Sequence, residues 1–313
     1  MKKIGGFLGL ELLGSNYGKY PGSLLLSTGR ACLNLILQKK KIKKLYIPYY
    51  TCDSIFEPIL FNGVKFEYYS IDNNFNPQIL NLGDGECFYY INYFGIKNKT
   101  IKKLIKTYGE NLIIDNTQAF YEGGYKNTYS YNSARKFFGV SDGAYLFSPV
   151  NINNNLKRNN NISLEHLIDN NLESSYKKFL YNESLLSLNV EKVSKISEYI
   201  LRNINYHKTA KIRNRNFNYL GSHLNQINKL KFSIKKSTVP LCYPLLLDKI
   251  IDKNFFYSKN LFIPTFWERN IETIKCDFSF EKELPKKLIP LPIDQRYSTK
   301  EMEKIVHILY EFI

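Results

Sequence analysis

An acid and a lysine near the middle of the chain have the side chains and the spacing for covalent cofactor chemistry. Asp115 directly follows the apolar run 112–114, and Lys136 comes about 20 residues later, a separation that fits short strand–loop–strand connections. Lys136 lies in a loop with Gly139 and Gly143. A lysine can form a Schiff base with pyridoxal 5'-phosphate, and a carboxylate can keep the pyridine nitrogen of that cofactor protonated. The pair therefore predicts a pyridoxal phosphate site.

The phosphate of such a cofactor needs hydrogen-bond donors, and the segment 27–33, with the sequence STGRACL, offers them. Its small polar residues precede an apolar pattern at helical spacing, which predicts the start of a helix. The first amides of a helix have no intrahelical partner and bind phosphate well. We therefore expect the amides of Gly29, Arg30 and Ala31 to hold the phosphate, although the same pattern also caps ordinary helices.

Three further side chains near the acid and the lysine could contact the cofactor. Ser133 and Ser130 precede Lys136 and offer hydroxyls to the phosphate, but for Ser130 a strand-edge hydroxyl is the favoured alternative. Gln118 follows Asp115 within one turn, so its amide could donate to the O3′ atom of the ring if the chain turns there.

Apolar runs alternate with segments of helical spacing over the first half of the chain, which predicts an α/β fold with a largely parallel sheet. We expect strands at 45–48, 64–68, 87–91, 111–114 and 144–147, and helices at 53–61 and 101–108. Ligands collect at the carboxyl ends of the strands in such a sheet. The segment 151–161, rich in asparagine, is expected to be a mobile surface loop.

The second half of the chain has a different pattern. Helical spacing covers 164–180 and 190–220, strands are expected at 239–247, 261–267 and 288–294, and an amphipathic helix is expected at 300–313. This pattern predicts a large domain at 1–205 and a small C-terminal α+β domain at 206–313.

The composition excludes several function classes. The net charge of +16 suggests an anionic partner, yet the only dense basic run, 39–44, lies where a helix should end, so no nucleic-acid partner is expected. The five scattered cysteines form no CxxC pair and do not cluster with the histidines, so we expect no metal site and a reducing, cytoplasmic compartment. No apolar run is long enough to insert into a membrane, and the lysines at 2–3 precede no clean cleavage site.

Seven segments of the chain resemble the DegT/DnrJ/EryC1/StrS family of pyridoxal phosphate-dependent sugar aminotransferases, in its short S-x-R-K branch. They are IGGFLGLEL (4–12), STGRACL (27–33), YIPYYTCDSIFEPI (46–59), INYFG (91–95), IIDNTQAF (113–120), SARKFFGVSDGAYL (133–146) and LPIDQRYSTKEM (291–302). The resemblance implies a fold-type-I enzyme with a mixed, mostly parallel seven-stranded sheet in the large domain. It also implies a homodimer with sites at the interface.

By this resemblance Lys136 is the Schiff-base lysine, Asp115 the partner of the pyridine nitrogen and Gln118 the neighbour of O3′. The implied reaction moves an amino group from an amino acid, glutamate in the simplest case, to a keto sugar that is usually nucleotide-linked. The branch is associated with surface polysaccharide biosynthesis. Cys52 stands where other members often carry an aromatic side chain against the cofactor, and Tyr50 and Tyr93 are the alternatives for that role.

Three other functions stay open on the sequence. Dehydratase members of the family remove a sugar hydroxyl, but they carry histidine in place of the lysine, and this chain has Lys136. A pyridoxal phosphate-fold protein that only binds its ligand is compatible with a chain shorter than the well-known members. A polyanion-binding protein would explain the charge but not the lysine loop.

Overall fold

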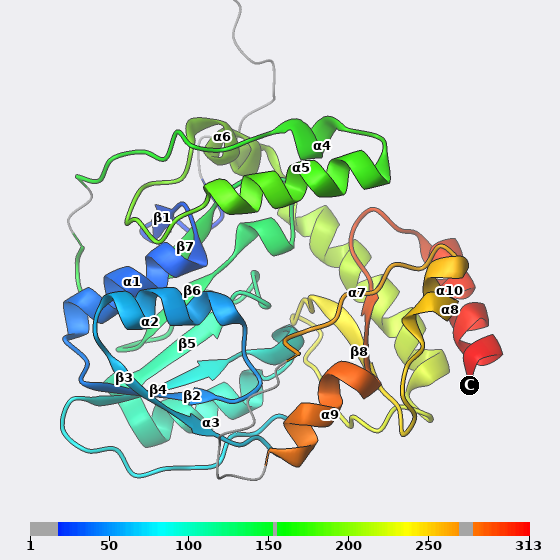
Figure 1. The fold of residues 1–313 in the computed structure, drawn as a ribbon, viewed down its shortest axis with the longest axis horizontal. Helices are drawn as coiled ribbons and strands as arrows, with labels where there is room; N and C mark the ends of the chain where they lie inside the picture. Colours follow the sequence, from blue (N-terminus) through cyan, green and yellow to red (C-terminus); the bar gives the residue numbers. More distant parts are fainter. Residues whose placement is uncertain (1–17, 153–154, 269–277) are drawn as a thin grey trace, which may run out of the picture.

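The computed structural model describes residues 18–152, 155–268 and 278–313. Seven strands form one sheet in the order β1-β7-β6-β5-β4-β2-β3 (Figure 1). Only β7 runs antiparallel to its neighbours β1 and β6, and the other pairs are parallel. The predicted mixed, mostly parallel seven-stranded sheet is therefore confirmed. The segment 4–12, which contributes to the family resemblance, lies outside the described residues.

Five of the seven strands of the large sheet fall close to the predicted runs, and β1 and β6 were not predicted. The seven strands are β1 (Leu24–Leu26), β2 (Lys44–Pro48), β3 (Lys65–Tyr69), β4 (Glu86–Ile91), β5 (Leu112–Asn116), β6 (Tyr129–Asn132) and β7 (Ala144–Phe147). The side chains of β4 and β5 are almost all buried, because helices cover both faces of the sheet centre. The polar strand β6, with the sequence YSYN, has no apolar pattern that would predict it.

Helices and short 3-10 turns connect these strands. They are α1 (Gly29–Lys40), η1 (Asp53–Ile55), α2 (Phe56–Phe61), η2 (Tyr93–Gly95), α3 (Asn98–Tyr108), η3 (Gly109–Asn111), η4 (Ala134–Lys136), α4 (Glu165–Ile168), α5 (Leu172–Leu185) and α6 (Lys195–Asn203). Helix α1 begins after Thr28 and ends at Lys41, whose left-handed backbone closes it. The basic run at 39–44 therefore lies at a helix C-terminus, as expected.

A second group of elements fills the C-terminal side of the molecule, seen on the right of Figure 1. It comprises α7 (Tyr206–Leu224), β8 (Cys242–Leu246), α8 (Lys253–Ser258), α9 (Ser279–Lys287), β9 (Leu288–Pro292) and α10 (Thr299–Phe312). Strands β8 and β9 pair antiparallel, and apolar side chains from α7, β8, α8, β9 and α10 form their own buried cluster. This α+β group begins where the sequence places the second domain, and the boundary at 206 stays a prediction.

Three expectations for the second half of the chain are wrong. The helical pattern at 190–220 begins only at Lys195 and is interrupted between α6 and α7 at Ile204 and Asn205. The segment 261–267 is not a strand: Leu261 and Ile263 are buried, but Pro264 has no N–H for a ladder, and the backbone is irregular. The helical pattern at 164–180 is broken into α4 and α5 around Asn170 and Asn171, because Asn171 caps α5 with its side chain.

The asparagine-rich segment 151–161 is not simply a surface loop where the structure describes it. The guanidinium of Arg158 donates to the carbonyl of Val193 and to Glu198, both at 2.7 Å. The buried amide of Asn159 donates to Asp142 at 3.0 Å. Polar side chains of this segment therefore make specific hydrogen bonds near the lysine loop.

Asp142, which follows the lysine loop, is fully buried and joins three parts of the chain. Its carboxylate accepts hydrogen bonds from the amide of Ser194 at 2.8 Å, from the hydroxyl of Ser194 at 2.7 Å and from Asn159. Because Asp142→Ala leaves these buried donors without an acceptor, we expect it to lower the free energy of unfolding by about 2–4 kcal/mol. Equilibrium denaturant unfolding measures this loss.

Asp248→Ala is the matched control, because Asp248 is exposed and its ion pair within the described part of the chain is with the exposed Lys229. An exposed ion pair contributes about 0–1 kcal/mol, so the unfolding midpoint should hardly move. Equal effects of the two substitutions would contradict the role of Asp142.

Candidate functional site

A cavity of about 340 Å³ opens where the carboxyl ends of the central strands meet the start of α1. Its volume lies at the lower end of the ~300–1,000 Å³ range of small-molecule sites. The lining side chains come from α1, η1, β5, β6, η4 and α5 and the loops beside them: Thr28, Gly29, Arg30, Leu33, Cys52, Ser54, Ile55, Asp115, Thr117, Tyr131, Ser133, Arg135, Lys136 and Glu183.

The sheet register brings the acid to this cavity. Asp115 lies in β5, between Ile91 of β4 and Tyr131 of β6. Its Oδ2 accepts a hydrogen bond from the hydroxyl of Tyr89 at 2.6 Å, and its Oδ1 accepts from the amide of Thr117 at 2.6 Å. The Tyr131 hydroxyl lies 3.4 Å from Oδ2. The carboxylate is thus held in one orientation while it still lines the cavity.

Burial raises the pKa of the Tyr89 and Tyr131 phenols well above their usual value, and the nearby charge of Asp115 adds to the shift. Both phenols therefore keep their protons, and the hydroxyl of Tyr89 remains a donor to the carboxylate. The two hydroxyl oxygens lie 2.7 Å apart. This neutral pair stabilises the negative charge of Asp115 without placing a cation against it.

Lys136 reaches the same cavity from the turn η4. Its Nζ donates to the hydroxyl of Thr117 at 3.1 Å. Thr117 therefore contacts both predicted key residues, since its amide binds Asp115 and its hydroxyl binds Lys136. The side chain of Lys136 is exposed and lines the cavity, so its amine is accessible to a small molecule.

The start of α1 lies at the cavity, but one of its three predicted amide donors is already paired. Ala31 is not available as a phosphate donor, because its amide donates to the side chain of Thr28 at 3.0 Å. The amides of Gly29 and Arg30 are the remaining first-turn donors. A Cβ atom on Gly29 would lie 3.4 Å from the side chains of Thr117 and Tyr131, so glycine keeps this side of the cavity open.

Two guanidinium groups line the cavity, and each pairs with a glutamate. Arg30 pairs with Glu57 at 2.9 Å and donates to the carbonyl of Leu186. Arg135, next to the lysine, forms an ion pair with Glu183 of α5. Burial lowers the pKa of Arg135 to about 10, and the charge of Arg30 adds to the shift, so Arg135 keeps its charge at neutral pH.

Of the two predicted serines, the structure brings only Ser133 to the cavity. Successive residues of a strand point to opposite faces. Because Tyr131 lines the cavity, Ser130 of the same strand β6 points to the other face. Ser130 is fully buried there, and its hydroxyl has no hydrogen-bond partner among the described residues.

Of the three residues considered for a contact with the cofactor ring, one lies at the cavity and two do not. Cys52 lines the cavity. Tyr50 and Tyr93 are buried in the main core instead, with their rings stacked on each other at 6.0 Å and the hydroxyl of Tyr93 on the carbonyl of Tyr50. Among the described residues, the aromatic side chain at the cavity is Tyr131, from β6.

Gln118 does not line the cavity either. Its side-chain oxygen accepts a hydrogen bond from the amide of Phe94 at 2.6 Å, in the turn after β4. Its proposed contact with O3′ of the cofactor stays a prediction. The geometry gives Gln118 a different role, which is to hold the acid segment against the neighbouring turn.

The residues that line the cavity but were not predicted from the sequence include Thr117, Tyr131, Arg135 and Glu183. Two had a signal in the sequence, because Thr117 lies next to the acid segment and Arg135 precedes the lysine. Tyr131 could have been found only with the register of β6. Glu183 had no signal, because its place depends on how α5 crosses the lysine loop.

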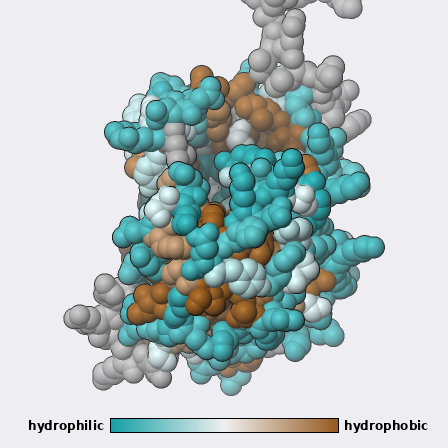
Figure 2. All heavy atoms as spheres, turned by 90° about the vertical axis from the view of Figure 1, so that its right-hand side faces the viewer, coloured by the Kyte–Doolittle hydropathy of each residue, from teal (hydrophilic) through white to brown (hydrophobic). Residues whose placement is uncertain are grey.

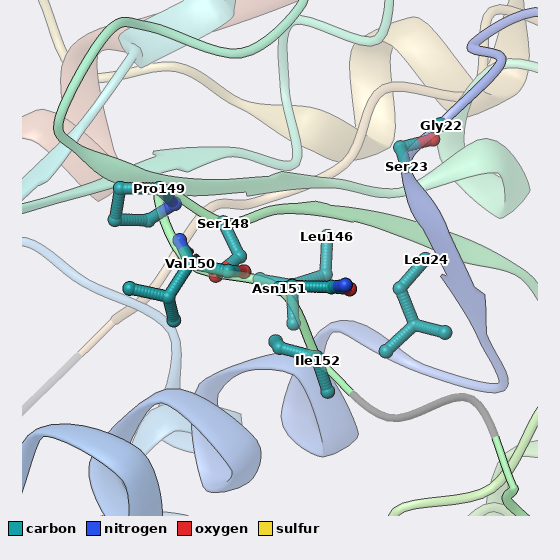
Figure 3. A pocket seen from close by; sticks show the side chains of 9 residues that line it. All are labelled: Gly22, Ser23, Leu24, Leu146, Ser148, Pro149, Val150, Asn151 and Ile152. Atoms are coloured by element: carbon teal, nitrogen blue, oxygen red, sulfur yellow. Dashed lines mark hydrogen bonds between the residues drawn. The ribbon is translucent and has the colours of Figure 1, made fainter.

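Other hollows of the described surface lie away from these residues. One of about 230 Å³ lies at the β1 edge of the sheet and is lined by residues of β1 and the turn before it, of β7 and of the loop that follows β7 (Figure 3). Leu24 and Leu146, which pair across β1 and β7, both line it. Among the described residues no group of three or more His, Cys, Asp or Glu could hold a metal ion.

Comparison with known proteins gives the fold but no family match. No family model and no curated protein matches the sequence. Solved structures do match it over nearly its whole length. The sugar aminotransferase CalS13 from Micromonospora echinospora has a TM-score of 0.64 at 11% identity and covers 92% of this chain and 86% of its own.

Two further structures extend this likeness. The aminotransferase TlmJ from Streptoalloteichus hindustanus has a TM-score of 0.64 at 12% identity, over 92% of this chain and 84% of its own. The E. coli GDP-4-keto-6-deoxy-D-mannose-3-dehydratase with bound hydrated PLP has a TM-score of 0.66 at 14% identity, over 93% of this chain and 88% of its own. The chain therefore has the fold of these pyridoxal phosphate-type enzymes, which confirms the predicted fold class and agrees with the sequence resemblance.

The contribution of the Thr28 hydroxyl to stability, as the cap of α1, can be tested directly. The hydroxyl of Thr28 accepts from the amide of Ala31 and donates to the carbonyl of Ser187 at 3.2 Å. Because Thr28→Ala removes a helix cap and leaves the Ser187 carbonyl unpaired, it should lower the free energy of unfolding by about 1–2 kcal/mol. Thr28→Ser keeps the hydroxyl and should stay close to the wild type in the same denaturant titration. A loss with serine as large as that with alanine would show that the hydroxyl is not responsible.

Proposed function

We propose that the chain is a pyridoxal phosphate-dependent aminotransferase that moves an amino group from an amino acid, with glutamate as the expected donor, to a nucleotide-linked keto sugar. The observation that carries this proposal is the meeting of Lys136, Asp115 and the start of α1 in one cavity of about 340 Å³. These groups come from three separate parts of the sequence. Their convergence supplies an amine, a carboxylate and phosphate-binding amides at the same place.

The residues of the cavity fit the cofactor. Pyridoxal phosphate, when bound, supplies an aldehyde that links to amines and a ring that withdraws electrons. Lys136 would hold the cofactor and move a proton at the reacting carbon. The carboxylate of Asp115 would stabilise a proton on the ring nitrogen, and the amides of Gly29 and Arg30 with the hydroxyl of Ser133 would hold the phosphate.

The charge of the cavity supports an anionic substrate. Three cations, Arg30, Arg135 and Lys136, line it against two carboxylates, Asp115 and Glu183, and the chain as a whole carries a net charge of +16. A nucleotide-linked sugar carries phosphates, for which guanidinium groups are suitable ligands. We place this reaction in surface polysaccharide biosynthesis on the sequence resemblance.

Exposed apolar side chains beside the cavity support a homodimer. Leu60 and Phe61 end α2 and are 66% and 65% exposed, and Tyr176 and Tyr181 of α5 are 60% and 59% exposed. Figure 2 shows a different face, the side of the C-terminal elements, where hydrophobic surface lies in the upper and lower parts with hydrophilic surface between them. Such side chains often mark contacts with another protein surface. We propose that a second copy covers the side of the cavity formed by α2 and α5.

Two further features belong to the proposal. Cys32, Cys52, Cys87 and Cys242 are free thiols, which suits a reducing, cytoplasmic compartment. The described helices include none long and apolar enough to cross a membrane. We assign 1–205 to a cofactor-binding domain and 206–313 to a small C-terminal domain.

A dehydratase is the second candidate, because one of the similar structures is named as a sugar dehydratase. The dehydratases that the sequence resembles carry histidine at the position of Lys136, which favours amino transfer here. The two reactions differ in their sugar product. Amino transfer leaves the amino group of the donor on the sugar, whereas dehydration removes a hydroxyl and adds no nitrogen.

Lys136 provides the first test of the function. We expect the purified protein to take up pyridoxal phosphate with a visible absorbance band, and glutamate to convert that band to the pyridoxamine form. Lys136→Ala removes the covalent attachment and the proton-transfer group, so amino transfer should fall by roughly 10²–10⁴-fold or more. Borohydride reduction followed by mass spectrometry should find the cofactor on Lys136.

Lys106→Ala serves as the control, because Lys106 is an exposed lysine on α3, away from the cavity. This variant should behave as the wild type. A wild-type protein that takes up no pyridoxal phosphate would end the proposal. Uptake without any response to amino acids would exclude the aminotransferase and leave the dehydratase or a binding role.

Asp115 provides the second test. Asp115→Asn has nearly the same shape but no charge to stabilise the proton on the ring nitrogen. We expect the variant to retain cofactor uptake, while the single-turnover rate with glutamate falls by roughly 10²–10³-fold. Stopped-flow absorbance measures this rate, and an unchanged rate would rule out the proposed role of the carboxylate.

A further inference from the structure

A buried guanidinium connects the C-terminal group of elements to the lysine loop. Arg213 of α7 is 2% exposed. Its guanidinium lies over the aromatic ring of Phe137, with Cζ 4.6 Å from the ring centre. Nε donates to the side-chain oxygen of Gln295 at 3.0 Å. Nη1 donates to the carbonyls of Leu241 at 3.2 Å and Pro240 at 3.4 Å.

The fourth hydrogen bond of this guanidinium is to the residue that follows Lys136. Nη2 of Arg213 donates to the carbonyl of Phe137 at 3.3 Å, and the amide of Gln295 donates to the same oxygen at 2.7 Å. Phe137 is the residue directly after Lys136. Two donors from distant parts of the chain therefore converge on one carbonyl of the lysine loop.

The same guanidinium is connected to the acid segment by a continuous series of hydrogen bonds. The side-chain oxygen of Gln118 accepts from the amide of Phe94 at 2.6 Å. The carbonyl of Phe94 accepts from the amide of Leu241 at 2.9 Å. The carbonyl of Leu241 accepts from Arg213, which also binds Phe137. The acid segment and the lysine loop are thus joined through the C-terminal group as well as through the sheet.

A buried charge is a costly way to join these parts. Burial lowers the pKa of Arg213 to about 10, so the group is still charged at neutral pH. A charged group inside a protein needs well-placed partners, and the hydrogen-bond acceptors of Arg213 are backbone and amide oxygens, while the charge of Asp294 also favours the cation. The planar guanidinium can hold several acceptors in a fixed arrangement, which a lysine cannot do.

Lys136 depends on its backbone for its position. Its side chain is exposed and, among the described residues, makes one hydrogen bond, to Thr117 at 3.1 Å. A long side chain with one contact has much rotational freedom, so the direction in which it leaves the backbone decides where its amine lies. That direction is set by the turn η4 and by the carbonyl of Phe137 that follows it.

We propose that Arg213 and Gln295 are positioning residues for Lys136. They hold the lysine loop at a fixed place relative to the acid segment, without touching the cofactor or the substrate. This inference rests on the proposed function, because it assumes that Lys136 forms the covalent link to pyridoxal phosphate. It also gives the C-terminal group a direct part in the chemistry of the large sheet.

The chain offers two variants and a matched control. Gln295→Ala removes the shorter bond to the carbonyl of Phe137, and Arg213→Lys keeps a cation but cannot reach all its acceptors. Asn216→Ala is the control. Asn216 lies on the same helix, is buried, and donates to the carbonyls of Ile293 and Tyr297, so it joins α7 to the same segment as Gln295 without contacting the loop.

The measurement is the rate at which each protein forms the borohydride-reducible link with pyridoxal phosphate, together with its affinity for pyridoxamine phosphate. The latter binds without a covalent link to the lysine. We expect Gln295→Ala and Arg213→Lys to slow the covalent link roughly tenfold, as loss of a positioning hydrogen bond does, with affinity for pyridoxamine phosphate close to that of the wild type. Asn216→Ala should keep the wild-type linking rate even if its melting temperature falls. Folding of every variant is checked by circular dichroism.

Two results would overturn the inference in distinguishable ways. If the wild-type chain takes up no pyridoxal phosphate, the proposed function and this inference fail together. If the wild type forms the link and Gln295→Ala forms it as fast as Asn216→Ala, the inference alone fails. Because Gln295 is only half-buried, that variant remains informative if Arg213→Lys does not fold.

Discussion

A buried carboxylate without a cation against it is the constraint on which the site depends. No ion pair among the described residues includes Asp115, so neutral donors must stabilise its charge, and Tyr89 and Thr117 supply them. These donors meet the carboxylate only if β4, β5 and β6 keep their register, because a slip of one residue would turn Tyr89 to the other face. The position of the Asp115 carboxylate in the cavity therefore depends on the correct register of β4, β5 and β6.

The parts of this arrangement that were predictable from the sequence are those in which residue type and order carry the information. Strands such as β4 and β5 are apolar runs that end in polar residues, and an acid followed by a lysine loop is uncommon enough to indicate a cofactor. The face of a short polar strand was not predictable. In β6, Ser130 and Tyr131 are neighbours with opposite directions, and the sequence YSYN has no apolar period that decides between them.

Contacts between distant segments were equally out of reach. Tyr50 and Tyr93 look like ligand-stacking aromatics in a chain with 25 tyrosines, yet their rings belong to the core. Glu183 lies at the cavity because α5 crosses the lysine loop, and Gln118 turns away from it because the amide of Phe94 needs an acceptor. Each of these outcomes depends on packing that only the folded chain contains.

The position of β1 at one end of the sheet has a consequence for how the protein is made. Leu24 pairs with Leu146, which leaves the ribosome about 120 residues later. At roughly 5–20 residues per second, the apolar strand β1 waits on the order of 10 s for its partner during synthesis. The lysine loop waits longer still, since Gln295 is added about 160 residues after Lys136. The nascent chain therefore exposes the apolar strand β1 without its partner while about 120 further residues are added.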